Sequence, residues 1–187
     1  MARTIPTMAQ AVPGNFVTAA LWNANVQALG NFVLAPPLFL AYASLPGASG
    51  GQSIPHNAFA AVLFDTEVID TEGGHSTTTN SQRYTFQVPG VYRIDGTATF
   101  TNNGTGFRAV KFELNTTGAT NGIAATERTA VAYSGFATSV STSTILRVNA
   151  GDYVSLNAYQ NSGAALTLDT DSAGEYASNM MIQWLSQ

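Results

Sequence analysis

The 187-residue chain contains no cysteine, and this absence excludes two kinds of architecture. Neither a disulfide framework nor a thiolate metal site is available, so packing alone must hold the fold together. The length suffices for one domain with a full hydrophobic core and an appendage.

Charged residues are also scarce. They make up 10% of the chain, against roughly 25% in typical soluble domains, while hydrophobic residues make up 45%. Because a monomer needs charge on its surface, this composition favours a chain that hides much of its surface against other subunits. The net charge of −4 provides no basic footprint for nucleic acid.

Long apolar runs are missing as well. The first residues lack the apolar core of a signal peptide. The apolar stretch at 32–42 is broken by Pro36 and Pro37 and is too short to span a bilayer. We therefore expect a soluble protein with no membrane partner.

Motifs for catalysis or cofactor binding are absent from the sequence. It has no G-x-S-x-G nucleophile elbow, no phosphate loop and no dinucleotide fingerprint. His56 and His75 lie in separate polar loops without a second ligand nearby in sequence. The acidic residues at 169–175 lack the EF-hand pattern, so a solvated turn is favoured there over calcium, and those at 65–72 alternate like a strand edge. We expect no enzyme activity, no cofactor and no metal.

The segment 84–100, YTFQVPGVYRIDGTATF, carries the clearest structural pattern in the chain. Its V-P-G-V stretch at 88–91 predicts a type II turn, with Gly90 at the position that requires a positive φ. The residues after the turn alternate with a period of two, which predicts an antiparallel strand with one buried face. The face predicted to be buried consists of Tyr92, Ile94, Gly96, Ala98 and Phe100.

Further short strands are predicted through the rest of the chain. They lie at 38–43, 59–64, 66–70, 107–115, 125–134, 138–148, 153–160, 165–169 and 178–185. Turn signals recur between them at the spacing of a β-sandwich, and no helix interrupts them. The predicted fold class is all-β, an antiparallel ten-strand jelly-roll sandwich built from residues 38–187.

The N-terminal segment 1–37 has a different character. Prolines and a glycine make its first part an extended arm, after which Thr18 can cap a short helix at 19–29 that Gly30 ends. Pro36 and Pro37 then form an extended linker to the sandwich. This pattern divides the chain into an N-terminal anchoring arm, 1–37, and a knob, 38–187.

Trp22, Val26 and Leu29 form one narrow apolar stripe on the predicted helix. A helix of about 11 residues is marginal alone in water, so the stripe must dock on something. It could pack back onto its own knob, or it could contact a partner. We favour a partner contact, because the di-proline separates the helix from the knob and tryptophan is frequent at binding hot spots.

Residues 38–187 resemble the tumour-necrosis-factor-like jelly roll, in particular the globular heads of complement. The matching stretches are VLFDTEVID (62–70), YTFQVPGVYRIDG (84–96), ILRVNAGDYVSL (145–156) and YASNMMIQWL (176–185). The resemblance implies a trimer that acts by binding, with apolar strand residues around a threefold axis. Met180 and Met181 stand where the family usually has an aromatic-rich last strand.

Three residues are candidates for that trimer interface. Tyr153 and Tyr159 alternate with the apolar residues of their strand, and Met181 belongs to the last strand. The two tyrosines could instead be ordinary surface residues or a face for glycans. We favour the interface, because an exposed sheet with so few charges would associate nonspecifically.

The N-terminal segment resembles those of tailed-bacteriophage virion proteins, in which T-A-A-x-W-N-x-x-V precedes a di-proline. The matching stretches here are VTAALWNANV and NFVLAPP. Together the two resemblances imply a homotrimeric virion protein whose residues 1–37 bind other virion proteins of the capsid or tail. Head decoration, or a head fibre, is favoured because no long shaft separates the anchor from the knob. The alternatives are a tail-tip or tail-fibre module that binds a receptor or host surface glycan, and a secreted adhesion module.

Overall fold

Two long antiparallel strands, β6 (Gly90–Phe100) and β9 (Thr138–Val148), pair along their whole length in the computed structural model. The structure describes residues 3–7, 14, 16, 18–43, 51–116, 128–132, 134–169 and 177–187. β6 is the strand predicted from its alternating sequence. Its buried face is the predicted one, consisting of Tyr92, Ile94, Gly96, Ala98 and Phe100.

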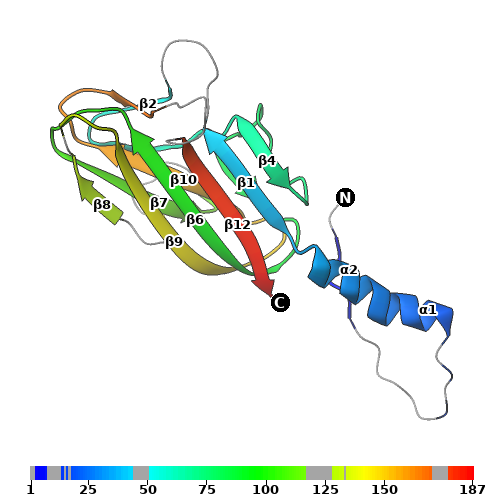
Figure 1. Ribbon diagram of the computed structural model, residues 1–187. Helices are drawn as coiled ribbons and strands as arrows, with labels where there is room; N and C mark the ends of the chain where they lie inside the picture. The colour runs from blue at the N-terminus through cyan, green and yellow to red at the C-terminus, as the bar shows by residue number, and fades with distance from the viewer. Residues whose placement is uncertain are drawn as a thin grey trace.

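The described strands form two main antiparallel sheets that pack face to face (Figure 1). The five-stranded sheet has the order β4-β1-β12-β6-β9 and adds β4 (Thr66–Asp70), β1 (Leu38–Ala43) and β12 (Ser178–Ser186). The four-stranded sheet has the order β5-β10-β7-β8, with bounds β5 (Arg83–Thr85), β10 (Tyr153–Gln160), β7 (Phe107–Leu114) and β8 (Arg128–Val131). A two-stranded pair, β2 (Ser53–Ile54) and β11 (Leu166–Thr167), lies outside them.

The hydrophobic core fills the space between the two main sheets. Aromatic and aliphatic side chains from both inner faces contribute to it, among them Phe39, Tyr84, Ile94, Phe112 and Leu156. Gly96 lies where β6 faces β7, and a Cβ atom there would come within 2.8 Å of the Phe112 ring. The close approach of the sheets at this point therefore depends on glycine.

A short strand, β3 (Ala58–Ala61), runs beside β10 at the edge of the second sheet. Flanking backbone hydrogen bonds join them, from Asn57 N to Gln160 O at 2.9 Å and from Val62 N to Leu156 O at 2.8 Å. The strand predicted at 59–64 is thus shorter than expected, because the backbone leaves β10 after Val62. Beyond this point the segment no longer bonds to β10, and Phe64 N donates to Ser81 O at 3.0 Å.

The predicted type II turn at 88–91 is wrong. Gly90 has a φ of +151°, far from the roughly +80° of that turn, and it is the first residue of β6. Glycine is nevertheless required, because a Cβ atom at this position would collide with the Trp184 indole and approach Ser186 O to 2.6 Å. The close packing of β12 over this backbone is the physical reason for the glycine.

The N-terminal helix is longer than predicted. Thr18 caps it as expected, accepting a hydrogen bond on Oγ1 from Leu21 N at 3.2 Å. It continues as α1 (Ala19–Trp22), a π-helical turn (Asn23–Gln27) and α2 (Ala28–Leu34). Gly30 does not end the helix, since it has no positive φ; the helix ends before Pro36 and Pro37, which cannot continue it.

Most of the remaining strand predictions hold. The strands at 38–43, 66–70, 138–148 and 153–160 have the predicted bounds. The strand expected at 165–169 shrinks to β11, which pairs with the two-residue β2. The acidic loop around Asp171 and Glu175, the turn at 117–122 and most of the arm before Phe16 lie outside the described residues.

Candidate interaction surfaces

The outer face of the five-stranded sheet has an apolar half and a polar half. The apolar half lies over β4, β1 and β12, where Ile69, Leu40 and Met181 are adjacent in one cross-strand row. Ile69 is exposed, and Leu40 and Met181 are half-buried. We define Ile69, Leu40, Met181 and the neighbouring Leu38 and Tyr42 as the apolar face.

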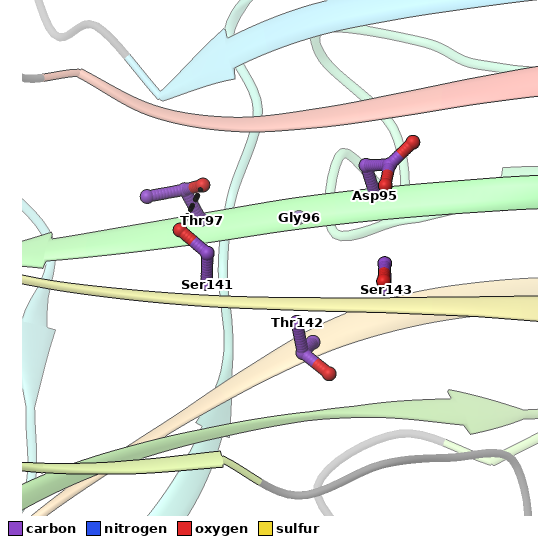
Figure 2. A pocket seen from close by; sticks show the side chains of 6 residues that line it. All are labelled: Asp95, Gly96, Thr97, Ser141, Thr142 and Ser143. Carbon is purple, nitrogen blue, oxygen red and sulfur yellow. Dashed lines mark hydrogen bonds between the residues drawn. The ribbon is translucent and has the colours of Figure 1, made fainter.

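The polar half of the same face lies over β6 and β9 (Figure 2). Thr97 and Ser141 turn their hydroxyls toward each other across the two strands, 2.8 Å apart, and Thr99 and Ser139 are 2.9 Å apart. A shallow groove beside Thr97 and Ser141 continues to Ser143 and Asp95.

A salt bridge borders the polar half. Arg93 Nε lies 2.9 Å from Asp95 Oδ2, and both residues belong to β6. Ile145 lies opposite Arg93 on β9 and is largely exposed. Hydroxyls, a carboxylate and guanidinium groups therefore share this surface with aliphatic side chains.

The helix at 19–34 projects away from the sandwich at the end where β12 finishes (Figure 1). It carries no charged residue, and its outer part exposes large apolar side chains. Trp22 is 55% exposed and Val26 43% exposed, while Leu29 is half-buried. No helix in the described part of the chain is long and apolar enough to cross a membrane.

The inner end of the helix is attached to the sandwich. Phe32 is buried and packs edge-on against Trp184 of β12, with ring centroids 5.0 Å apart. Arg3 stacks over the same Phe32 ring, forms an ion pair with the buried Glu72 and donates to Ala35 O at 2.5 Å. The start of the arm, the end of the helix and the sandwich thus meet at one junction.

The residues predicted for the trimer interface do not share one face. Met181 lies on the apolar face, whereas Tyr153 and Tyr159 point outward from β10 in the other sheet. Arg83 covers the Tyr153 ring, and the Tyr159 hydroxyl donates to Asn57 Oδ1 at 2.9 Å. Met181 therefore lies on one side of the sandwich and the two tyrosines on the other, and their place in a trimer interface stays a prediction.

The histidines and the acidic residues at 65–72 have structural contacts. His75 lies with Nδ1 3.3 Å from Glu67 Oε2 and Nε2 3.2 Å from Ser81 O. Asp70 accepts three backbone N–H groups and so shapes the loop after β4. His56 accepts a hydrogen bond from Gly163 N at 3.1 Å. Within the described residues, no group of three or more potential ligands could hold a metal ion.

Two kinds of environment shift pKa values in the sandwich. Burial raises the pKa of Tyr84 and of Tyr92, whose hydroxyl donates to Val88 O at 2.7 Å. The pKa of Asp152 is lowered by hydrogen bonds, first from Asn149 N and then from the Asn115 side chain. The tyrosines with raised pKa values lie in the core, and the aspartate with a lowered pKa lies in a turn, so none of these groups lines a polar cleft.

Sequence reasoning missed two features of these surfaces. The predicted helix ends at residue 29 and so leaves out Phe32, which is the buried residue of α2. The burial of Lys111 and Glu113 on the outer face of β7 was not predicted either. The signal that could have singled out Lys111 is its rarity, because it is the chain's only lysine.

Comparison with solved structures identifies the same fold in two kinds of protein. The globular domain of a zebrafish complement 1qA protein superposes with a TM-score of 0.56 at 14% sequence identity, covering 81% of this chain and 98% of that one. The crystal structure of murine APRIL at pH 5.0 gives a TM-score of 0.53 at 9% identity, covering 79% and 98%. No protein-family model matches the chain, and no curated protein matches it. The chain therefore has the jelly-roll fold shared by complement globular heads and tumour-necrosis-factor-like domains.

Proposed function

We propose that the protein is a non-enzymatic structural component of a tailed-bacteriophage virion, a homotrimer anchored through its N-terminal segment. The observation that carries the proposal is the helix at 19–34, which has no charge and exposes Trp22 and Val26 beyond its attachment at Phe32. An apolar surface of this kind is suited to contact with another protein. The resemblance of this segment to virion proteins supplies the partner class, a capsid or tail protein.

The apolar face is the proposed contact between subunits. Leu40 and Met181 lie side by side on it, and a monomer would leave them partly in water. The fold likeness and the scarcity of charge support a trimer formed through this sheet. Tyr153 and Tyr159 lie on the other sheet and have no part in this contact as we propose it.

The position of the helix also supports an anchor and a knob. The helix leaves the sandwich at the end where β12 finishes, so the opposite end, where β2 lies, faces away from an anchoring partner (Figure 1). We favour decoration of the head, since β1 begins only a few residues after the helix and leaves no room for a shaft.

A second candidate function is recognition of a host receptor or surface glycan at a tail tip. The groove beside Thr97, Ser141 and Asp95 favours it, because hydroxyl and carboxylate groups match the hydrogen bonds of a sugar. The number of copies per purified particle separates the two candidates. Head decoration requires many copies per particle, a tail tip requires few, and absence from particles contradicts both.

A further inference from the structure

Lys111 is the only lysine of the chain, and the protein buries it. Its side chain is 6% exposed and lies on the outer face of β7, away from the hydrophobic core. Glu113, two residues further along the same face, has a fully buried side chain, and its Oε1 lies 2.9 Å from Lys111 Nζ. A buried ion pair contributes little to stability compared with apolar packing, so its presence here calls for another explanation.

Asn157 of β10 lies directly opposite Lys111 in the antiparallel ladder. Residues paired in this way point to the same face with Cβ atoms about 4.5–5.5 Å apart, well within reach of a lysine side chain. Asn157 is fully buried, and its Nδ2 donates to Ser155 Oγ at 3.1 Å. An amine, a carboxyl group and a primary amide are therefore gathered on one buried patch of the β7–β10 pair.

A cluster of aromatic rings borders this patch. Lys111 Nζ lies 4.1 Å from the centroid of the Phe59 ring. Phe59 packs against Tyr159, which stacks on Phe107, with centroids 5.1 Å and 5.4 Å apart. Such surroundings exclude water, so water does not compete with the amine for the amide carbon.

We propose that Lys111 and Asn157 become joined by an intramolecular isopeptide bond, with Glu113 as the catalytic acid and base. The pair Lys111–Glu113 has the nucleophile-to-base distance that such chemistry needs. Asn157 supplies the electrophilic carbon, Cγ, and Ser155 holds the nitrogen that leaves.

The reaction balances without any co-reactant. Lys111 passes its extra proton to Glu113, and the neutral Nζ attacks Asn157 Cγ to form the new Nζ–Cγ bond. Glu113 then relays a second proton from Nζ to Nδ2, the Cγ–Nδ2 bond breaks, and the nitrogen leaves as ammonia. Glu113 finally gives the proton that it first took to the released ammonia, which departs as ammonium. One amine and one primary amide thus become one secondary amide and ammonia.

The bond would tie β7 to β10, the two central strands of the four-stranded sheet. It closes a loop between residues 111 and 157 that contains β8 and β9. A permanent link of this kind restricts the unfolded chain, as a disulfide does, in a protein that has no cysteine. It concerns the knob alone and does not depend on the proposed virion function.

The full-length protein tests the proposal without any variant. Its intact mass should be lower than the sequence mass by one ammonia molecule, and trypsin should release residues 109–128 covalently joined to 148–187. After denaturation, an amine reagent should modify the N-terminus and no lysine, because Lys111 is the only one. A full sequence mass with a reactive Lys111, or ammonia loss without linked peptides, would overturn the proposal.

Matched variants test the role assigned to Glu113. Glu113→Gln should retain the full sequence mass and a reactive lysine, whereas Glu67→Gln, at a carboxylate outside the patch, should lose ammonia as the wild type does. Lys111→Arg keeps a cation but cannot form the bond, and it should melt at a lower temperature than the linked protein. A cross-link that forms normally in Glu113→Gln would contradict a catalytic role for this residue.

Discussion

Phe32 and Trp184 meet edge to face, with ring planes at 85°, where the last turn of the helix reaches the last strand of the sandwich. One ring comes from the N-terminal segment and the other from the C-terminal strand, so the contact fixes the base of the helix on the knob. Ten residues earlier in the chain, Trp22 is more than half exposed. The same helix therefore has one aromatic residue that holds it to its own chain and one that is open to a partner.

Substitution of these two aromatic residues should have opposite consequences. Trp22→Ala should leave the melting temperature of the free protein nearly unchanged but reduce its retention on purified particles. Truncation of a tryptophan at an interface costs about 2 kcal/mol or more, which is about thirtyfold in affinity. Phe32→Ala removes a buried ring and should lower the stability of the free protein by about 3 kcal/mol. The measurements are melting curves and the amount of each variant bound to particles. Normal incorporation of Trp22→Ala with a much lower melting temperature would place Trp22 in the fold rather than in the anchor.

Two glycine-to-alanine substitutions form a second matched pair. Gly90→Ala should lower the free energy of unfolding by about 1–3 kcal/mol, because the methyl group has no room beside Trp184. Gly30→Ala should raise it by about 0.5–1 kcal/mol, because this glycine is inside the helix and its Cβ position is open. Chemical denaturation measures both. Equal effects at the two sites would contradict the described packing of β12 over Gly90.

The acid response of the fold should depend on Asp152. Hydrogen bonds from Asn149 N, at 2.7 Å, and Asn115 Nδ2, at 2.9 Å, hold its pKa below the ordinary 3.8. A lowered folded-state pKa means that its contribution to stability is present above 3.8 and is lost as the pH falls through the folded value. Asp152→Ala should cost about 1 kcal/mol near neutral pH, and the difference from wild type should disappear in strong acid. Urea titrations across this range measure it, and a pH-independent difference would exclude this carboxylate as the cause.

The sequence predicts those features of the fold that neighbouring residues determine, and it does not predict those that residues distant in the chain determine. Three features could be predicted because they depend on neighbouring residues: the helix cap at Thr18, the alternation in β6, and the bounds of β9 and β10. The structural roles of Gly30 and Gly90 could not be predicted in this way. The helix continues through Gly30 and ends before the two prolines, and Gly90 is required by Trp184, which packs on it from nearly a hundred residues away in the chain.

The candidate surfaces were predictable only in part. Trp22 is exposed on the helix, and its contact with a partner stays a prediction. The grouping of Tyr153 and Tyr159 with Met181 required knowledge of which strands share a sheet, and local sequence does not contain it. The burial of Lys111 likewise depends on Phe59, which approaches from a distant strand.

The subunit contact can be tested by charge on the apolar face. Met181→Asp should convert the trimer into a monomer, because a carboxylate buried between subunits without a partner costs several kcal/mol, at least about a hundredfold in association. Val131→Asp is the control, since Val131 is exposed on β8 in the other sheet. Light scattering of the full-length proteins should give one chain mass for the first variant and three for the second. A wild-type protein that stays monomeric at micromolar concentration would contradict the trimer itself.

The central claim is that this chain is a trimeric knob held on a virion by its N-terminal helix. An electron-microscopy map of intact phage particles that contain the protein tests this claim most directly. We expect threefold density of jelly-roll shape on the head surface, in many copies, with the helix at 19–34 inserted against the underlying capsid protein and Trp22 at the contact. Particles that lack such density, or knobs attached through the opposite end of the sandwich with the helix in solvent, would contradict it.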